Sequence, residues 1–455
     1  MNQTEQSDIE PLETEAEDSA APVASHAGPP PEATPPFDIG ASDDSLARMT
    51  ELFARPGDKS GVYPPARMGH VYVIHHPDDV KRVLVSNHRN YRKGLGLDRV
   101  KILLGNGIMT SEGEFWRRQR YMLQPLFHRR IITRFAETIA AANDELVARW
   151  APLAQRGESV NISDETSEMT LSIVLQSIFG SDLQRLIEEL GENPFAVVAR
   201  ETHRDLRFAY RFRSLGRHIV DLVQRRHAEP AEHFDYLAML MNARDKESGD
   251  AMSEKELVDE VMTLIVAGHE TTASALNWTW YLIARHPEVE RRLHASLDAA
   301  PAYESLQLLQ AEELGYARQV CDESLRLYPP GWLLSRRTLA ADVLGGYEVP
   351  AGTDVLLAPY LLHRHPRYWQ DPERFLPERF DAAHEAERPR FAYMPFAAGP
   401  RHCIGETVAI YEMLVHLYKV ARRYRLVLES DAPVEREAQV NLRTRQPLIM
   451  RLELR

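Results

Sequence analysis

Cysteine is scarce in this chain of 455 residues, which contains only Cys321 and Cys403. Two thiols cannot build a disulfide framework, and they are too few for a zinc site made of several thiolates. No apolar run reaches the ~20 residues that a bilayer-spanning helix needs, and the N-terminus lacks the charged and then apolar pattern of a secretory signal. We therefore expect a cytoplasmic protein without a membrane anchor.

Lysine and arginine are absent from residues 1–44, which hold 11 Asp or Glu and 7 of the 29 prolines. Such a segment has too little apolar surface to offset the entropy of ordering. We predict a disordered acidic, Pro-rich tail over 1–44, either a solubilising leader or a tether for a partner. The tail accounts for most of the formal charge of −13, so residues 45–455 are nearly neutral, which argues against nucleic acid as a partner.

A single large domain is predicted for residues 45–455, because no further Pro-, Gly- or Ser-rich stretch and no internal repeat interrupts them. Apolar residues recur mostly at helical spacing. Strand-like segments are confined to residues 71–74 and the region 347–357, where glycines mark turns. The predicted fold class is therefore mainly α with small β-sheets.

Three helices have predictable ends. Ser111, with a glutamate three residues later, forms a capping box that should begin one helix. Ser253 forms a second capping box, which should begin a long helix ending at Pro287, roughly 32 residues later and about 48 Å long. A third helix is expected over 314–327, before a Pro-Pro pair.

Cys403 lies in a loop that suits a thiolate. Gly399 permits a turn that a side chain would block, and Gly405 lets the backbone approach the sulfur. The apolar run 408–417 predicts a helix directly after the loop, and a helix N-terminus lowers the pKa of a thiol. Arg401 adds a permanent cation nearby. The alternative, an inert cysteine that packs as a small hydrophobe, suits the other thiol, which lies in an ordinary helical pattern.

The loop residues Phe396, Gly399, Arg401, Cys403 and Gly405 match the pattern Phe-x-x-Gly-x-Arg-x-Cys-x-Gly. The chain thus resembles the soluble, bacterial type of the cytochrome P-450 superfamily. The resemblance implies the cytochrome P-450 fold over residues 45–455 and haem b as the cofactor. It implies that Cys403 is the axial thiolate ligand of the iron, which favours O–O cleavage, and that Arg401 pairs with a haem propionate.

A second family pattern, Glu-x-x-Arg, is matched by Glu323 and Arg326 on the third predicted helix. The resemblance implies a buried structural network, completed by Arg379, that holds the cysteine loop. The pattern itself is weak, since it occurs five other times in the chain, and the alternative is an ordinary surface pair.

The long helix contains the stretch Ala267-Gly-His-Glu-Thr-Thr. Glycine is unfavourable inside a helix, and threonine can bond the carbonyl of the preceding turn. The resemblance implies that Ala267 lies against the haem, and that Glu270 and Thr271 form an acid–alcohol pair that delivers protons where oxygen binds. The alternative is a kink with a solvated glutamate.

Haem propionates need cationic or N–H donors. Trp116 and Arg120, four residues apart on one helix face, match the Trp-x-x-x-Arg pattern of the family. The family often supplies a further arginine from a strand, and here the spacing favours Arg337 over Arg336.

The reaction implied is insertion of one oxygen atom from O₂, by hydroxylation or epoxidation, into a lipophilic molecule such as a fatty acid, a terpenoid or a polyketide-like secondary metabolite. The alternatives are peroxide-driven or redox-neutral chemistry on the same fold, or a haem sensor or carrier. We expect a monomer whose pocket is roofed by residues ~90–110 and ~190–220. One arginine of the second segment could clamp a carboxylate, although such a run more often forms an exposed helix face.

Two electrons would come from a separate ferredoxin or flavodoxin with its NAD(P)H reductase, because no flavin or nicotinamide segment is recognised. Acidic partners of this kind would dock on basic residues near the cysteine. The candidates are Arg117, Arg118, Arg129, Arg130, Lys419, Arg422 and Arg423.

Overall fold

A computed structural model describes residues 46–47, 49–50, 62–63, 71–74, 76–94, 96–200, 206–229, 231–302 and 314–455. The predicted acidic tail over 1–44 lies outside these residues. Within the described ranges, no helix is both long enough and apolar enough to cross a bilayer.

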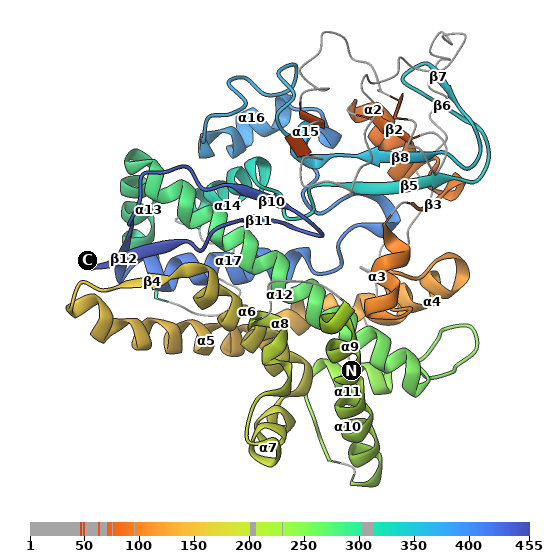
Figure 1. Ribbon diagram of the computed structural model, residues 1–455, viewed down its shortest axis with the longest axis horizontal. Helices are drawn as coiled ribbons and strands as arrows, with labels where there is room; N and C mark the ends of the chain where they lie inside the picture. Colours follow the sequence, from red (N-terminus) through yellow and green to blue (C-terminus); the bar gives the residue numbers. More distant parts are fainter. Residues whose placement is uncertain are drawn as a thin grey trace, which may run out of the picture.

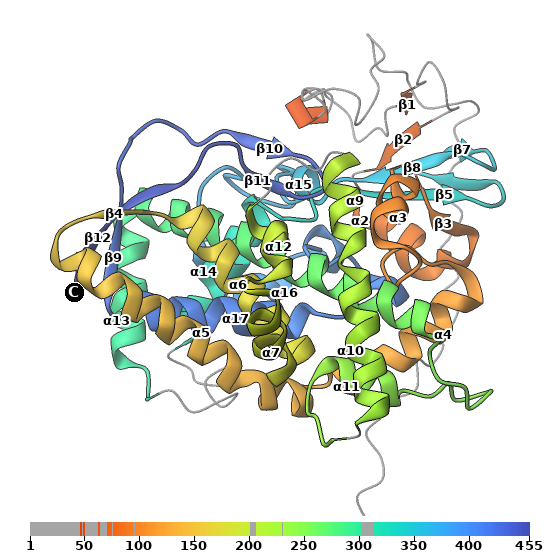
Figure 2. The same cartoon turned by 60° about the horizontal axis from the view of Figure 1, so that its bottom comes forward.

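Helices dominate the fold, as the apolar spacing predicts (Figures 1 and 2). Their bounds are α2 Pro77–Lys81, α3 Leu97–Leu104, α4 Gly113–Leu123, α5 Arg129–Gln155, α6 Ile162–Phe179, α7 Ser181–Leu190, α8 Val197–Arg200, α9 Leu206–Ser214, α10 Gly216–Ala228, α11 Tyr236–Asn242, α12 Glu254–Arg285, α13 Pro287–Ala299, α14 Gly315–Leu327, α15 Pro359–Leu362, α16 Ala382–Glu387 and α17 Glu406–Ala421.

The strands form small sheets. A five-stranded sheet has the order β1-β2-β8-β5-β3, a three-stranded sheet has the order β4-β12-β9, and β6-β7 and β10-β11 are hairpins. In Figure 1 the five-stranded sheet lies to one side of the helices. The bounds are β1 Val62–Tyr63, β2 Val71–Ile74, β3 Tyr91–Lys93, β4 Ser159–Asn161, β5 Leu334–Thr338, β6 Asp342–Leu344, β7 Tyr347–Val349, β8 Asp354–Leu357, β9 Tyr424–Leu428, β10 Arg436–Ala438, β11 Leu442–Thr444 and β12 Ile449–Leu454.

Helix α12 crosses the centre of the molecule (Figure 1). Its 32 residues begin at the predicted capping box, in which the Ser253 hydroxyl accepts from the Glu256 N–H and the Glu256 carboxylate accepts from the Ser253 N–H at 2.7 Å. The N-terminal half packs with α6, α9 and α10, and we call that cluster the lid core. The C-terminal half packs with α5, α14 and α17, and we call that cluster the main core. The prediction of one long helix ending near Pro287 is confirmed.

The capping box predicted at Ser111 is wrong. Helix α4 begins at Gly113 with Glu112 as its N-cap residue and without a side-chain cap. The Glu112 carboxylate is engaged elsewhere, since it accepts the backbone N–H of Lys93 at 2.8 Å and the guanidinium of Arg401. Long-range contacts therefore override the local capping pattern at this end.

Candidate functional site

The Cys403 loop is closed by its own backbone and by close packing. The Cys403 N–H donates to the Phe396 carbonyl at 2.9 Å. Gly399 has φ +71°, and a Cβ there would lie 1.9 Å from the carbonyl oxygen of Leu84, so only glycine fits. A Cβ on Gly405 would lie 4.0 Å from the Cys403 sulfur, which is an ordinary contact. The tight position in the loop is therefore Gly399.

The Cys403 side chain keeps accessible surface, and yet protein surrounds it. Burial raises the pKa of the thiol, while the N–H groups of Gly405 and Glu406 at the start of α17 oppose that rise. The Cys403 sulfur is therefore largely surrounded by protein, although some of the residue's surface stays accessible. The helix N-terminus alone does not make the thiolate, but a coordinated metal deprotonates a thiol outright.

The cation that stabilises the Cys403 thiolate is Arg120, which also donates to the His402 carbonyl at 2.9 Å. The expectation that Arg401 supplies this charge is not met. Arg401 is held against α4, where it forms an ion pair with Glu112 and stacks on Trp116 with its guanidinium carbon 4.1 Å from the ring centroid.

Arg401 belongs instead to a cluster of buried cations. Lys93 on β3 lies directly opposite Arg336 on β5 in the antiparallel register. Burial, together with the charge of Arg401, lowers the pKa of Arg336 to about 10. Burial and the charges of Arg401 and Arg336 lower the pKa of Lys93 to about 7. Since Glu112 is the acid that acts on both groups most directly, the cluster has a surplus of positive charge and suits an anion.

Arg337, the strand arginine favoured by sequence spacing, points to the opposite face of β5 because successive strand residues alternate. It lies opposite Asp354 of β8 and donates to both carboxylate oxygens, at 3.0 Å and 2.6 Å. The structure thus places Arg336, and not Arg337, within the influence of the Arg401 charge.

The predicted oxygen-site stretch lies inside unbroken α12. Ala267 is exposed, both of its chain neighbours are half-buried, and Ile265 and His269 are buried. A Cβ on Gly268 would lie 2.9 Å from a Val174 methyl on α6, so glycine allows this helix contact. The Thr271 hydroxyl donates to the Ala267 carbonyl at 2.7 Å, as the sequence suggests.

Glu270 contacts a distant part of the chain. Its Oε2 accepts from the side-chain amide of Asn441 at 3.1 Å, across 171 positions in the sequence. Asn441 lies between β10 and β11. The predicted acid of the acid–alcohol pair is thus held by a hydrogen bond from a hairpin.

The cysteine loop and the exposed part of α12 each lie where the two cores adjoin. Phe396 and Val408 pack against the main core, whereas Ile404 packs against the lid core. Helix α12 passes from the lid core to the main core between Ile265 and Ala275. Cys403 and Ala267 therefore both lie at this junction, and both have accessible surface.

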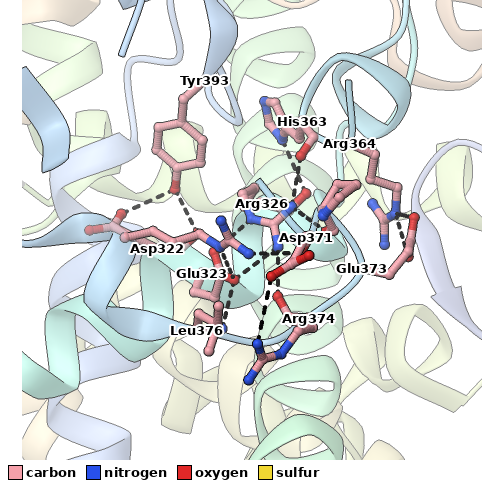
Figure 3. Close-up of polar contacts among 12 residues, drawn as sticks. Asp322, Glu323, Arg326, His363, Arg364, Asp371, Glu373, Arg374, Leu376 and Tyr393 are labelled. Atoms are coloured by element: carbon pink, nitrogen blue, oxygen red, sulfur yellow. Dashed lines mark hydrogen bonds and ion pairs between the residues drawn. The ribbon is translucent and has the colours of Figure 1, made fainter. Parts of the chain in front are cut away.

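The Glu-x-x-Arg pair forms the buried network drawn in Figure 3. Glu323 and Arg326 are both fully buried and form two hydrogen bonds, at 2.6 Å and 2.8 Å. Arg326 also donates to three backbone carbonyls, those of His363, Pro372 and Arg374. Arg379 donates to Glu323 at 3.3 Å, so the structure brings the three predicted residues together.

The residues at the junction fit haem. A single accessible thiol could be an axial ligand, and among the described residues no group of three His, Cys, Asp or Glu side chains offers a competing metal site. The cations of the cluster suit propionates, and Ala267 leaves room against a flat ligand. Cys403 would hold the iron, while Arg336, Arg401 and Lys93 would hold the carboxylates.

The cytochrome P450 family model matches residues 37–451. The chain is similar to the cytochrome P450DA haem domain, with a TM-score of 0.83 at 22% identity over 94% of this chain and 98% of that one. The fold is therefore the cytochrome P450 fold that the sequence predicts. The chain belongs to the cytochrome P450 family of haem-thiolate proteins, and it is an oxidoreductase of the monooxygenase class.

Two relatives come from Streptomyces melanosporofaciens. Cyclooctat-9-en-7-ol 5-monooxygenase is 35% identical over 78% of this chain and 80% of its own length. Cyclooctatin synthase is 33% identical over 84% of this chain and 85% of its own length. Pentalenene oxygenase of Streptomyces avermitilis is 28% identical over 84% of this chain and 88% of its own length.

Sequence reasoning missed two residues of the site, Lys93 and Glu112, and it ranked Arg336 below Arg337. Lys93 and Glu112 carry no motif; the pairing of β3 with β5 places Lys93, and a hydrogen bond from the Lys93 N–H connects Glu112 with it. Alternation along β5 could have placed Arg336 beside Arg401, had the register been known. No local signal connects Asn441 with Glu270.

Proposed function

We propose that the protein uses haem b to insert one atom of O₂ into a terpenoid. Haem bound through a thiolate supplies the activation of O₂. The observation that carries the proposal is the accessible Cys403 thiol at the junction of the two cores, where α12 exposes Ala267.

The chain's own residues divide the work. Trp116 and Arg401, which stack on one another at the cation cluster, would hold the propionate groups of the cofactor. The Thr271 hydroxyl can change its hydrogen bond from the Ala267 carbonyl to a reacting oxygen, and the carboxylate of Glu270 can move a proton toward it. Asn441 fixes the orientation of that carboxylate.

A terpenoid substrate is supported by the relatives, whose names specify cyclooctat-9-en-7-ol, cyclooctatin and pentalenene. A carboxylate clamp for a fatty acid has less support. Arg207 and Arg211 are exposed on α9, and Arg213 donates to the Ile102 carbonyl at 2.8 Å. Arg204 lies outside the described residues.

Electrons are proposed to come from a separate acidic protein docking near the cysteine loop. Several predicted basic residues already have acidic partners, since Arg117 pairs with Glu114, Arg118 with Glu256, and Lys419 with Asp144. Arg129 and Arg130 are exposed at the start of α5 and are the stronger candidates.

The test is turnover of diterpene and sesquiterpene alcohols with a surrogate ferredoxin, its reductase and NADPH under isotope-labelled O₂. We expect one labelled oxygen atom in the product. Thr271→Ala should consume NADPH with less product, because the proton donor is lost. Products formed with peroxide but never with NADPH would instead support a peroxygenase.

A further inference from the structure

The segment Gly105–Thr110 between α3 and α4 is attached to α12 by two adjacent carboxyl groups. Asp259 Oδ2 accepts the backbone N–H of Asn106 at 3.0 Å. Glu260 Oε2 accepts the backbone N–H of Ile108 at 2.9 Å. We call Gly105–Thr110 the latch segment, because its backbone is bound to helix side chains rather than to a strand.

Two glycines bring the latch segment unusually close to α12. A Cβ on Gly105, where φ is +72°, would lie 2.0 Å from Asp259 Oδ1. A Cβ on Gly107 would lie 2.3 Å from the Thr263 hydroxyl. Lys93 of β3 also donates to the Met109 carbonyl. The latch segment is therefore held between α12 and the cation cluster.

Glu260 is expected to lower the stability of the folded state at this position. It is 0% exposed, and its Oε1 atom has no hydrogen-bond partner among the described residues. Burial, reinforced by Asp259 and Glu256 on the same helix and opposed by the Ile108 N–H and by Lys93, raises the pKa of Glu260 to about 8. A buried carboxyl with one unpaired oxygen lowers stability, so a functional reason for it is expected.

Helix geometry connects Glu260 with the reaction site. Glu260, Leu264, Ala267 and Thr271 are spaced by four, three and four residues, so they share one face of α12. The latch segment bound at Glu260 is thus attached at the N-terminal end of the face that carries the exposed Ala267. Ile108 and Met109 are partly buried against the lid core, which includes the first half of α12.

We propose that Glu260 is a positioning residue that determines substrate specificity. Its carboxyl holds the latch segment over the α12 face where substrate binds, and so sets the space left for a terpenoid. The proposal rests on the proposed monooxygenase function for the identity of the ligand, but the attachment itself does not depend on catalysis.

The experiment compares full-length haem-loaded wild type, Glu260→Ala and Glu260→Gln. Amide hydrogen exchange of residues 105–110 measures the attachment, and substrate-induced spin-state titration gives Kd for a monoterpene, a sesquiterpene and a diterpene alcohol. Glu260→Ala should speed exchange by about tenfold or more and change the ratio of the Kd values. Glu260→Gln keeps an acceptor oxygen and should stay near wild type. Unchanged exchange in Glu260→Ala, or equal effects of both variants, would overturn the proposal.

A second pair of variants covers the case in which Glu260→Ala does not bind haem. Gly105→Ala should push the latch segment from Asp259 and give the same rise in exchange. Gly191→Ala is the matched control, because Gly191 has φ +76° with no atom within 4 Å of an added Cβ. Equal exchange at residues 105–110 in these two variants would overturn the attachment.

The two proposals fail separately. Faster exchange with unaltered Kd ratios would overturn the specificity role of Glu260 and leave the monooxygenase function standing. A wild type that turns over none of the terpene alcohols would overturn the substrate class, while the exchange result would still report on the attachment.

Discussion

Replacing Glu323 by alanine should be among the most damaging single changes in this protein. Glu323 and Arg326 are each 0% exposed, and Glu323 also accepts the Leu376 N–H at 2.8 Å and the Arg379 guanidinium. The substitution leaves the Arg326 guanidinium buried without its counter-ion, and it leaves the backbone N–H of Leu376 without its acceptor. Both losses affect the segment that leads to the cysteine loop (Figure 3).

The expected cost of Glu323→Ala is about 3–5 kcal/mol, because an unpaired buried charge is far more costly than the pair is stabilising. Domains of this kind have roughly 5–15 kcal/mol of stability in total. We therefore expect Glu323→Ala to yield no haem-bound protein. The same four-residue pattern occurs at Glu114 and Arg117, whose side chains form an ion pair at 2.9 Å. These two side chains are 80% and 54% exposed. Glu114→Ala should cost less than about 1 kcal/mol.

The assay measures the haem-to-protein ratio of the purified variants and the midpoint of urea unfolding, with Glu114→Ala as the matched control. A Glu323→Ala protein with normal haem content and the midpoint of Glu114→Ala would refute the structural role of the network.

Three other results are expected. Glu412 on α17 is buried, its Oε1 lacks a partner among the described residues, and burial raises its pKa to about 8. The folded state therefore keeps a proton that the unfolded chain loses above the ordinary pKa of 4.5. Because of this difference, the stability of wild type should fall as the pH rises from about 5 to 8. The unfolding free energy of Glu412→Gln relative to wild type should rise by about 3 kcal/mol by pH 7, and no pH dependence of that difference in urea titrations would contradict the assignment. Arg336→Ala should lose haem to apomyoglobin at least about tenfold faster than wild type, because a charge-assisted contact is lost. Arg337→Ala should mainly lower the unfolding temperature. Faster haem loss from Arg337→Ala than from Arg336→Ala would instead assign the propionate contact to Arg337. The rate of reduction by an acidic ferredoxin should fall as the salt concentration rises. Charge reversal at Arg129 and Arg130 should remove this dependence of the rate on salt. A wild-type rate that does not change with salt would exclude electrostatic docking.

Features that depend on neighbouring residues could be predicted from the sequence. The capping box at Ser253 and the proline at 287 define α12, because a helix end is decided within a turn. The cysteine loop and the pair Glu323 and Arg326 are likewise short patterns. The prediction for Arg379 came from the family resemblance, and the structure gives its contact with Glu323.

Features that depend on contacts distant in the sequence could not be predicted. Arg337 and Arg336 differ by one position, and only the register with β3 and β8 decides which faces the cation cluster. The carboxylate of Glu112 is taken by Arg401, which lies 289 residues further along the chain. The hydrogen bond from Asn441 to Glu270 belongs to the same class.

The most direct test of the account is the absorption spectrum of the reduced, CO-bound full-length protein, measured for wild type and Cys403→Ser. Wild type should show the strongly red-shifted Soret band of a thiolate-ligated haem, and Cys403→Ser should lose that band. A colourless wild type after expression with ample porphyrin precursor, or a serine variant with an unchanged spectrum, would contradict ligation of iron by Cys403.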